Sequence, residues 1–323
     1  MKRIGVLTSG GDGPGLNPCI RAVVRTALGI NMSVMGIHRG YTGLVHGEIE
    51  EMTARSVGGI IGRGGTILGT TRSAEFATTH GQVDAMRNLN RFGVEGLVVI
   101  GGNGSLTGAL KLHERGVKVV GLPGTIDNDL GGSDVTIGVD TTLNTILDAI
   151  DKIKDTASSH QRAFLIETMG RDCGYLAVMS ALAGGAEMAL IPEFPTTLDE
   201  VCSILKDAYI RGKAHCIIIV AEGWKPGIHE LETLLKAEKD DLGFEVRTIV
   251  LGHIQRGGSP SAYDRILATR LGAGAVEALV DGASGVMIGW VGGKVARTPL
   301  EEVLKPSEKV KPELLRLEKM MEQ

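Results

Sequence analysis

Two carboxylates stand two residues apart in a loop that follows an apolar run. The run at 119–122 predicts a buried strand, and it leads into Pro-Gly-Thr-Ile-Asp-Asn-Asp at 123–129. Asp127 and Asp129 in such a loop can serve as a general base, as metal ligands, or only as caps of a turn. Because Asp-Asn-Asp is common in turns, this motif alone leaves all three roles open.

Two glycine-rich loops follow two other apolar runs. Ser-Gly-Gly-Asp-Gly-Pro-Gly at 9–15 and Gly-Gly-Asn-Gly-Ser at 101–105 each come between a run and a helical pattern. Amides at such a helix start bind anions, so the pair predicts a polyphosphate ligand, with two unrelated turns as the alternative. Neither loop matches G-x-G-x-x-G or the Walker motif, which argues against a dinucleotide fold and a P-loop NTPase.

Anionic substrates would be repelled by the two aspartates unless arginine or a metal offset the charge. Arg171 lies in Met-Gly-Arg at 169–171, and the segment 252–260 places His253 and Arg256 beside a glycine pair. A histidine with an arginine in that setting suits a phosphate monoester. The ordinary alternatives are a surface arginine and a core histidine. The further candidate cations are Arg72, Arg162 and Arg247.

Short apolar runs that must position these loops alternate with helical patterns. Continuous rather than alternating apolar character predicts strands covered on both faces, hence a doubly wound α/β fold with mostly parallel sheets in two lobes. Helices are predicted near 20–28 and 143–153 from apolar spacing. The runs are 4–7, 34–37, 97–100, 119–122, 164–166, 189–191, 216–220, 249–251 and 286–288.

Composition and net charge argue against some classes of binding partner. The 323-residue chain has a net charge of −4 and only 3% aromatic residues, which argues against a nucleic-acid-binding surface. No stretch reaches the ~18 apolar residues that span a membrane, and the N-terminal apolar run is too short for a signal peptide, so we expect a cytoplasmic protein. The scattered cysteines predict reduced thiols rather than a metal site; they are Cys19, Cys173, Cys202 and Cys216.

Taken together, the motifs resemble the bacterial ATP-dependent 6-phosphofructokinases along essentially the whole chain. The resemblance rests on the segments 10–17, 63–66, 123–129, 159–162, 169–171 and 252–260. It implies two Rossmann-like lobes with the active site between them: an ATP lobe at 1–138 plus about 256–302, and a fructose 6-phosphate lobe at 139–255 plus about 303–323. The implied reaction, part of glycolysis, transfers the γ-phosphoryl group of Mg-ATP to the 1-hydroxyl of fructose 6-phosphate.

The resemblance also implies roles for individual residues. Asp127 would be the base, and Thr125 and Arg171 would stabilise the transferring group. Asn103 and Asp129 would lie on the Mg²⁺ side of the site, and Asp129 would also be a catalytic residue. The expected ATP contacts are Gly11, Tyr41, Arg72, Gly102, Asn103, Gly104 and Ser105. The expected sugar phosphate contacts are Thr125, Asp127, Met169, Gly170, Arg171, Glu222, His253 and Arg256, with Arg162 and Arg247 from a neighbouring subunit of a homotetramer.

An effector site for a nucleotide or phosphoenolpyruvate is also implied. Lys154 stands where the family usually has an arginine, which leaves the sign and strength of regulation open because lysine lacks the bidentate grip of arginine. The expected effector contacts are Arg21, Arg25, Arg55, Lys154, Gly185, Glu187, Arg211 and Lys213.

The phosphoryl donor is predicted from two glycines. Gly104 and Gly124 match the ATP-dependent branch of the family, whereas the pyrophosphate-dependent branch usually has Asp and Lys there. We expect the glycines to leave room for the α-phosphate and ribose of the nucleotide.

One residue departs from the family pattern at the magnesium side. Asn103 replaces an Asp, and losing a charged hydrogen bond of about 1.5–3 kcal/mol predicts transfer that is slower by roughly 10- to 100-fold. A weak regulatory or binding paralogue is therefore the alternative, and deamidation of Asn103 before Gly104 would restore the carboxylate. Pyrophosphate or another phosphosugar, such as tagatose 6-phosphate, is a further alternative, whereas an NAD or lipid kinase would not explain 252–260.

Overall fold

The computed structural model describes residues 1–306 and 310–321 of the chain, without the side chains of residues 239 and 240. The chain forms two compact units. Unit 1 comprises Met1–Ile126, Leu130–Thr141 and Arg256–Ser307, and unit 2 comprises Asp127–Asp129, Thr142–Gln255 and Glu308–Gln323. The sequence-based boundaries at 138 and about 302 thus differ from these by a few residues, and the three residues 127–129 group with unit 2.

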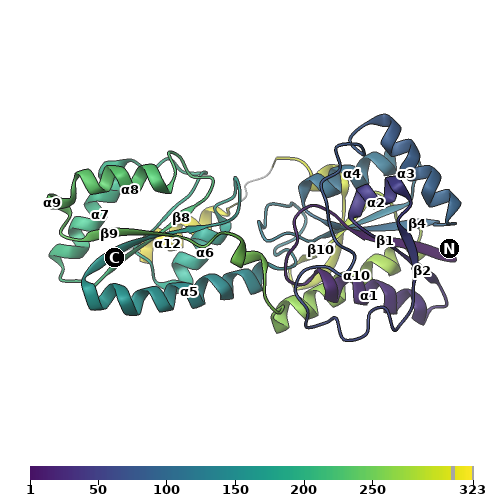
Figure 1. The fold of residues 1–323 in the computed structure, drawn as a ribbon, viewed down its shortest axis with the longest axis horizontal. Coiled ribbons are helices and arrows are strands. Elements are labelled where there is room, and N and C mark those ends of the chain that lie inside the picture. Colours follow the sequence, from purple (N-terminus) through teal and green to yellow (C-terminus); the bar gives the residue numbers. More distant parts are fainter. Residues whose placement is uncertain (307–309, 322–323) are drawn as a thin grey trace. The chain divides into compact units, whose positions relative to one another are not determined.

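Unit 1 contains a seven-stranded sheet in the order β11-β10-β5-β4-β1-β2-β3 (Figure 1). Its inner strands pair in parallel, and the edge strands β3 and β11 are antiparallel. The strands are β1 (Arg3–Thr8), β2 (Ser33–Ile37), β3 (Ile49–Met52), β4 (Gly96–Gly101), β5 (Val119–Pro123), β10 (Val286–Val291) and β11 (Lys294–Pro299).

Helices cover both faces of this sheet because successive strand residues point to opposite sides. Val6 of β1 packs into a core with α1 and α10, while Leu7 packs into a second core with α2, α3 and α4. The helices are α1 (Leu16–Gly29), α2 (Gly40–His46), α3 (Thr79–Arg91), α4 (Asn103–Glu114), α10 (Ala262–Val280) and α11 (Leu300–Val303).

Unit 2 is built on a four-stranded parallel sheet in the order β7-β8-β6-β9. Leu205 of α7 and Leu231 of α8 pack on one face of it, against Val220. The strands are β6 (Arg162–Thr168), β7 (Met188–Leu190), β8 (Cys216–Ala221) and β9 (Glu245–Val250). The helices are α5 (Val139–His160, whose first three residues belong to unit 1), α6 (Tyr175–Gly184), α7 (Leu198–Ile210), α8 (Ile228–Ala237), α9 (Lys239–Leu242) and α12 (Pro312–Met321), with a 3₁₀ turn η1 (Gly252–Arg256, whose last residue belongs to unit 1).

The predicted doubly wound α/β fold is confirmed, and each of the nine apolar runs overlaps a strand. The strands that were missed are β3 and β11, which are polar and largely exposed edge strands. The prediction for β9 began too late because the first four residues of the strand, Glu-Val-Arg-Thr, are mostly polar at a sheet edge. A continuous run of apolar residues identifies inner strands, but it does not identify edge strands, because these are partly polar. Within the described residues, no helix is long and apolar enough to cross a bilayer.

All four cysteines have free thiols, as expected from their spacing. Cys19, Cys173 and Cys216 are buried, and burial raises the pKa of the Cys19 and Cys216 thiols. These two thiols therefore stay protonated and act as core side chains.

The core of unit 2 gives a direct stability prediction. Ile218 in β8 is fully buried, so Ile218→Ala should lower the free energy of unfolding by about 2–5 kcal/mol through lost burial and a cavity. The matched control Ile210→Ala removes the same atoms from a side chain that is 79% exposed, and it should change stability by less than about 0.5 kcal/mol. Urea unfolding of both variants measures the difference, and equal losses would contradict this core assignment.

Candidate active site

Three loops of unit 1 converge because they follow three neighbouring parallel strands. In the order β5-β4-β1, the carboxyl ends of the strands share one edge of the sheet, and the loops start at residues 124, 102 and 9. The Ser9 amide donates to the Ile100 carbonyl at 3.0 Å, and the Gly124 amide donates to the Gly101 carbonyl at 3.1 Å. The structure therefore brings together the three loops that the sequence singled out.

Glycine is needed where these loops touch. A Cβ built at Gly101 would lie 2.5 Å from the Ser9 carbonyl oxygen, and one built at Gly124 would lie 2.9 Å from Ile100 and 2.8 Å from Leu16. At Gly104, by contrast, no atom of the described residues lies within 4 Å of the added Cβ. The expectation of open space thus holds at Gly104, whereas at Gly124 it is wrong, because protein atoms fill that space.

Tyr41 supports the loop 102–105, which includes the first residues of α4. Tyr41 is 4% exposed, and its hydroxyl donates to the Ser105 carbonyl at 2.6 Å. Its ring stacks on Phe76 with centroids 3.9 Å apart, and burial raises the pKa of its phenol. Tyr41 therefore supports the loop 102–105 as a neutral buried side chain. Gly102 is the N-cap of α4, so the first amides of the helix belong to this loop, a geometry that favours anions.

The segment 62–72 lies against the first glycine-rich loop. The buried Asn17 side chain donates to the Arg63 and Gly64 carbonyls at 3.1 Å each and accepts from the Ile67 amide at 2.7 Å. The Thr70 hydroxyl donates to the Gly10 carbonyl at 2.7 Å. These bonds fix the backbone that leads to the exposed Arg72. Asn17 was not predicted as a functional residue, although its place two residues after Gly15 is a usable signal.

Arg256 lies over the same loop. Its guanidinium Nη1 donates to the Asp12 carbonyl at 2.9 Å, and a Cβ at Gly11 would lie 2.5 Å from that nitrogen. Gly11 and Arg256, predicted for nucleotide and sugar phosphate respectively, are thus in direct contact within unit 1. A side chain at position 11 would displace the guanidinium.

In unit 2, a buried carboxylate pairs with an arginine. Asp127 is 3% exposed, and its Oδ2 lies 3.5 Å from Nε of Arg171. Arg171 has a positive φ of 53° and follows Gly170 with φ of 137°, a turn conformation that side chains rarely adopt. The guanidinium is half exposed, so it can reach a ligand while it offsets the charge of Asp127.

Two further side chains fix the turn that carries Arg171. One oxygen of Glu222 accepts from the Gly170 amide at 3.1 Å and the Arg171 amide at 2.7 Å. The fully buried Gln255 accepts from the Met169 amide at 3.1 Å. Met169, Gly170, Arg171 and Glu222, all predicted for the sugar phosphate, therefore form one cluster. Gln255 was missed, although it lies inside the motif 252–260.

Glu167 is a carboxylate that was not predicted as a site residue. It lies one residue before the end of β6. Its register partner on β8 is Val220, which precedes Glu222 by two residues in the chain. Burial, and then the charge of Glu222, raise its pKa above the ordinary value. Paired acids at adjacent strand ends are a sequence signal that could have identified it.

Arg162 and Arg247 lie at the other end of this sheet. They share the Glu245 carboxylate, with Arg162 Nε 2.8 Å from its Oε2 and Arg247 bonded to its Oε1. The seven residues of β6 span about 20 Å at ~3.3 Å per residue, so Arg162 at the start of the strand lies far from Met169, which follows its last residue, Thr168. His253 is exposed in η1, after β9.

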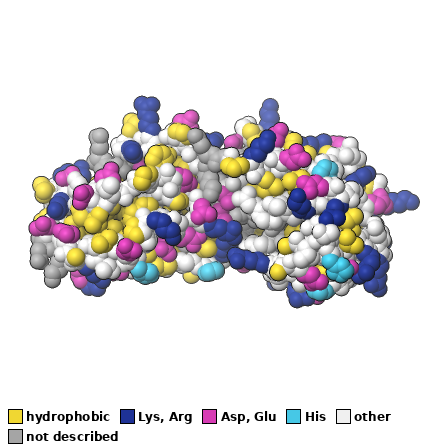
Figure 2. Space-filling view, turned by 90° about the horizontal axis from the view of Figure 1, so that it is seen from above, with side chains coloured by type: hydrophobic (Ala, Val, Ile, Leu, Met, Phe, Trp, Pro, Cys, Tyr) yellow, Lys and Arg dark blue, Asp and Glu magenta, His cyan; other side chains and the backbone are white. Residues whose placement is uncertain are grey.

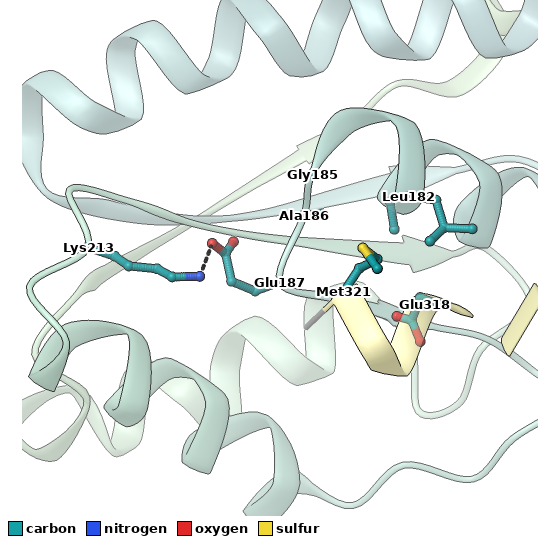
Figure 3. A pocket seen from close by; sticks show the side chains of 8 residues that line it. Leu182, Gly185, Ala186, Glu187, Lys213, Glu318 and Met321 are labelled. Atoms are coloured by element: carbon teal, nitrogen blue, oxygen red, sulfur yellow. Dashed lines mark hydrogen bonds and ion pairs between the residues drawn. The ribbon is translucent and has the colours of Figure 1, made fainter. Parts of the chain in front are cut away.

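Three of the predicted effector residues line one pocket of unit 2 (Figure 3). Gly185, Glu187 and Lys213 meet there, and Lys213 Nζ lies 3.2 Å from Oε1 of Glu187. The opposite wall is α12, which was not predicted: Glu318 accepts from the Ala189 amide at 2.7 Å, and Met321 completes the wall.

The other predicted effector residues are not pocket-lining. Lys154 bonds to the Gly184 carbonyl beside Gly185, and Arg211 is the C-cap of α7 with its side chain on the Asp207 carbonyl. Arg21, Arg25 and Arg55 belong to unit 1. Space-filling views show arginine and lysine side chains scattered over the visible face of both units (Figure 2).

The predicted magnesium residues are too few for a metal cage. In the described part of the chain, no group of three His, Cys, Asp or Glu side chains could hold a metal ion. Asn103 belongs to unit 1 and Asp129 to unit 2. One carboxylate and one amide oxygen are nonetheless the hard donors that suit Mg²⁺ when substrate phosphates and water supply the other ligands.

Comparisons of the sequence and of the structure with known proteins both find phosphofructokinases. Residues 3–279 match the family model described as phosphofructokinase. The chain is 54% identical over 322 residues to ATP-dependent 6-phosphofructokinase 1 of Thermus thermophilus, covering 99% of both chains, and 56% identical over 289 residues to the ATP-dependent 6-phosphofructokinase of Natranaerobius thermophilus, covering 90% and 89%.

Solved structures give the same fold. The phosphofructokinase of Pichia pastoris in the T-state aligns with a TM-score of 0.89 at 38% identity, over 94% of this chain and 37% of that one. A pyrophosphate-dependent phosphofructokinase from Marinobacter aquaeolei aligns with a TM-score of 0.83 at 20% identity, over 99% and 91%, which supports the fold alone.

The contact between the glycine loops can be tested with one methyl group. Gly101→Ala places a Cβ 2.5 Å from the Ser9 carbonyl, so the loops must separate, and we expect a loss of about 1–3 kcal/mol in unfolding free energy. The control is Gly29→Ala, which adds a methyl at a site with no described atom within 4 Å. Equal melting temperatures for Gly101→Ala and Gly29→Ala would contradict the close contact.

Proposed function

The chain belongs to the phosphofructokinase family, and we propose that it transfers the γ-phosphoryl group of Mg-ATP to the 1-hydroxyl of fructose 6-phosphate, giving fructose 1,6-bisphosphate in glycolysis. The observation that carries this proposal is the buried Asp127 carboxylate paired with Arg171 at 3.5 Å. In the chain, Asp127 directly follows residues 124–126, which belong to the loop after β5 beside the loops after β4 and β1. A carboxylate that accepts a proton and a cation that offsets phosphate charge suit in-line phosphoryl transfer to a hydroxyl.

In this reaction Asp127 is the general base. It accepts the proton of the sugar 1-hydroxyl while the oxygen forms its bond to the γ-phosphorus, and the bond from that phosphorus to the bridging oxygen of ADP breaks. Thr125 and Arg171 stabilise the transferring phosphoryl group. Because Glu222 and Gln255 fix the turn at 169–171, the guanidinium needs little reorganisation.

The nucleotide is assigned to the loops of unit 1. Gly11, Gly102, Gly104 and Ser105 bind the phosphates, Arg72 adds charge, and the open space at Gly104 supports ATP as donor. Asn103 and Asp129 are the residues for Mg²⁺, which neutralises charge on the phosphate oxygens when bound. Tyr41 acts through the loop that it supports.

The sugar phosphate is assigned to Met169, Gly170, Glu222, His253 and Arg256. Along the strand direction at ~3.3 Å per residue, Arg162 lies about 23 Å from Met169, and Arg247, which pairs with Phe164, lies about 17 Å from it, too far for both to grip the same phosphate as Met169 within one chain. We therefore assign them to the site of a neighbouring subunit, which requires an oligomer, and a homotetramer is the proposed form. Effector binding by a nucleotide or phosphoenolpyruvate at the pocket of Glu187 and Lys213, and a cytoplasmic location, are further parts of this proposal.

A second candidate function rests on Asn103. If the missing carboxylate limits catalysis, the chain is a weak paralogue that binds the substrates and regulates an active partner. Pyrophosphate or a different phosphosugar as substrate is the remaining alternative.

The base is tested by substitution at Asp127. Asp127→Asn keeps the shape but cannot accept the proton, so kcat should fall by roughly 10²- to 10⁴-fold with ATP and fructose 6-phosphate saturating. The control Asp151→Asn removes the same charge from an exposed position on α5 and should retain kcat. A coupled assay for fructose 1,6-bisphosphate measures both, and an Asp127→Asn variant as fast as wild type would refute the proposed base.

The magnesium side is tested by Asn103→Asp. A restored carboxylate at the first residue of α4 should raise kcat by about 10- to 100-fold, since the lost charged interaction is worth about 1.5–3 kcal/mol. Steady-state kinetics should be run with ATP and with pyrophosphate, and peptide mass at residues 103–104 should exclude deamidated wild type. No change in kcat would remove the case for a weak paralogue.

A further inference from the structure

A buried carboxylate in unit 1 has no role in the proposed reaction. Asp264 lies in the first turn of α10 and is 0% exposed. Its Oδ1 accepts from the Gly138 amide at 2.9 Å, and its Oδ2 accepts from the Thr141 amide at 2.8 Å and the Thr141 hydroxyl at 2.5 Å. Burial raises its pKa in spite of these three bonds. A costly buried acid with such an ordered set of donors calls for an explanation.

Residues 136–138, which we call the strap, connect Asp264 to the segment that carries Thr125. The connection is made by hydrogen bonds. The Ile137 amide donates to the Pro123 carbonyl at 2.9 Å, and Ile137 forms a parallel bridge with Gly124. The buried Thr136 hydroxyl donates to the Thr125 carbonyl at 2.5 Å. Three consecutive strap residues therefore link Asp264 to the backbone of 123–125.

The strap is also closely packed against Pro14, Gly15 and Ile126. Gly138 has φ of 106°, and a Cβ there would lie 2.8 Å from the Pro14 carbonyl and 3.3 Å from Ile126. A Cβ at Gly15, with φ of 105°, would lie 2.5 Å from the Ile137 side chain. Because the packing is so close, a shift of the strap moves the 124–126 segment with it, whereas its contacts with the glycine-rich loop are at Pro14 and Gly15, beyond Gly11 in the chain.

A second set of bonds orients Thr141. Its hydroxyl accepts from the Ser261 amide at 2.9 Å while it donates to Asp264, so the direction of the donated proton is fixed. Ser261 is the N-cap of α10, accepts from the Asp264 amide at 3.2 Å, and donates to Asp140 at 2.5 Å. The starts of α5 and α10 are thereby locked together around one carboxylate.

We propose that Asp264 is a positioning residue for phosphoryl transfer: through Gly138 and Thr141 it fixes the strap, and the strap fixes the backbone that carries Thr125 and leads into Asp127. This inference rests on the proposed function. Asp264 contacts neither substrate, so its loss changes where the reacting groups lie rather than how ATP is held. We therefore expect kcat to fall while the KM values for ATP and fructose 6-phosphate stay within about twofold.

The test uses a matched pair at Thr141. Thr141→Val keeps the shape and deletes the hydroxyl, whereas Thr141→Ser keeps the hydroxyl. Thr141→Val should lose roughly 10-fold or more in kcat, because small misplacements of reacting groups are costly, and Thr141→Ser should stay close to wild type. Asp264→Asn, which retains the side-chain shape, should show the same fall in kcat with unchanged KM, and it replaces Thr141→Val if that variant does not fold.

A destabilising control separates positioning from stability. Thr197→Val removes the capping hydroxyl of α7, which accepts from the Glu200 amide at 3.3 Å in unit 2. This variant should lower the melting temperature without changing kcat. If Thr141→Val is as fast as Thr141→Ser, or if Thr197→Val loses as much kcat, the positioning role is refuted.

Hydrogen exchange keeps this test independent of turnover. If the wild type shows no turnover, the proposed function fails, but the strap can still be judged. Amides of Gly124, Ile137 and Gly138 should exchange at least several-fold faster in Thr141→Val than in Thr141→Ser. Equal exchange in the two variants would overturn the inference even in an active enzyme.

Discussion

The structure depends on close backbone approach at the carboxyl ends of three neighbouring parallel strands. β5, β4 and β1 end side by side. A Cβ at Gly101 would lie 2.5 Å from the Ser9 carbonyl oxygen, and one at Gly124 would lie within 3 Å of the Leu16 and Ile100 side chains. This constraint explains why glycines cluster in the motifs. It also directs the first amides of α4 and the segment 124–126 toward the same edge of the sheet, where ligands bind in open α/β folds.

The chemistry is divided between the units by the course of the chain. Unit 1 supplies amides and glycines, which suit a polyphosphate, and unit 2 supplies Asp127 with Arg171 and the turn that Glu222 and Gln255 fix. The chain passes from one set to the other within the segment 124–129. Thr125 precedes Asp127 by two residues in this segment, and the backbone of Thr125 is held by the strap, which Asp264 bonds at Gly138.

The sequence predicts much of this arrangement because inner parallel strands are continuously apolar and their loops carry glycine and charge. It singles out Asp127 and Arg171, which the structure pairs, but not Gln255, Asn17 or Asp264, because a buried polar residue has no periodic signal and its partners are far away in the chain. Edge strands β3 and β11 were missed since they are polar. The steric interpretation of Gly124 failed because sequence cannot show which side of a backbone faces protein.

The most direct test of the central claim follows the transferred phosphoryl group itself. Fructose 6-phosphate is incubated with Mg²⁺ and ATP labelled at the γ-phosphate, and the products are separated and located by position. The account predicts one labelled phosphate on the 1-hydroxyl of the sugar for each ADP formed. Label that remains in ATP, or that appears only as inorganic phosphate, would contradict it.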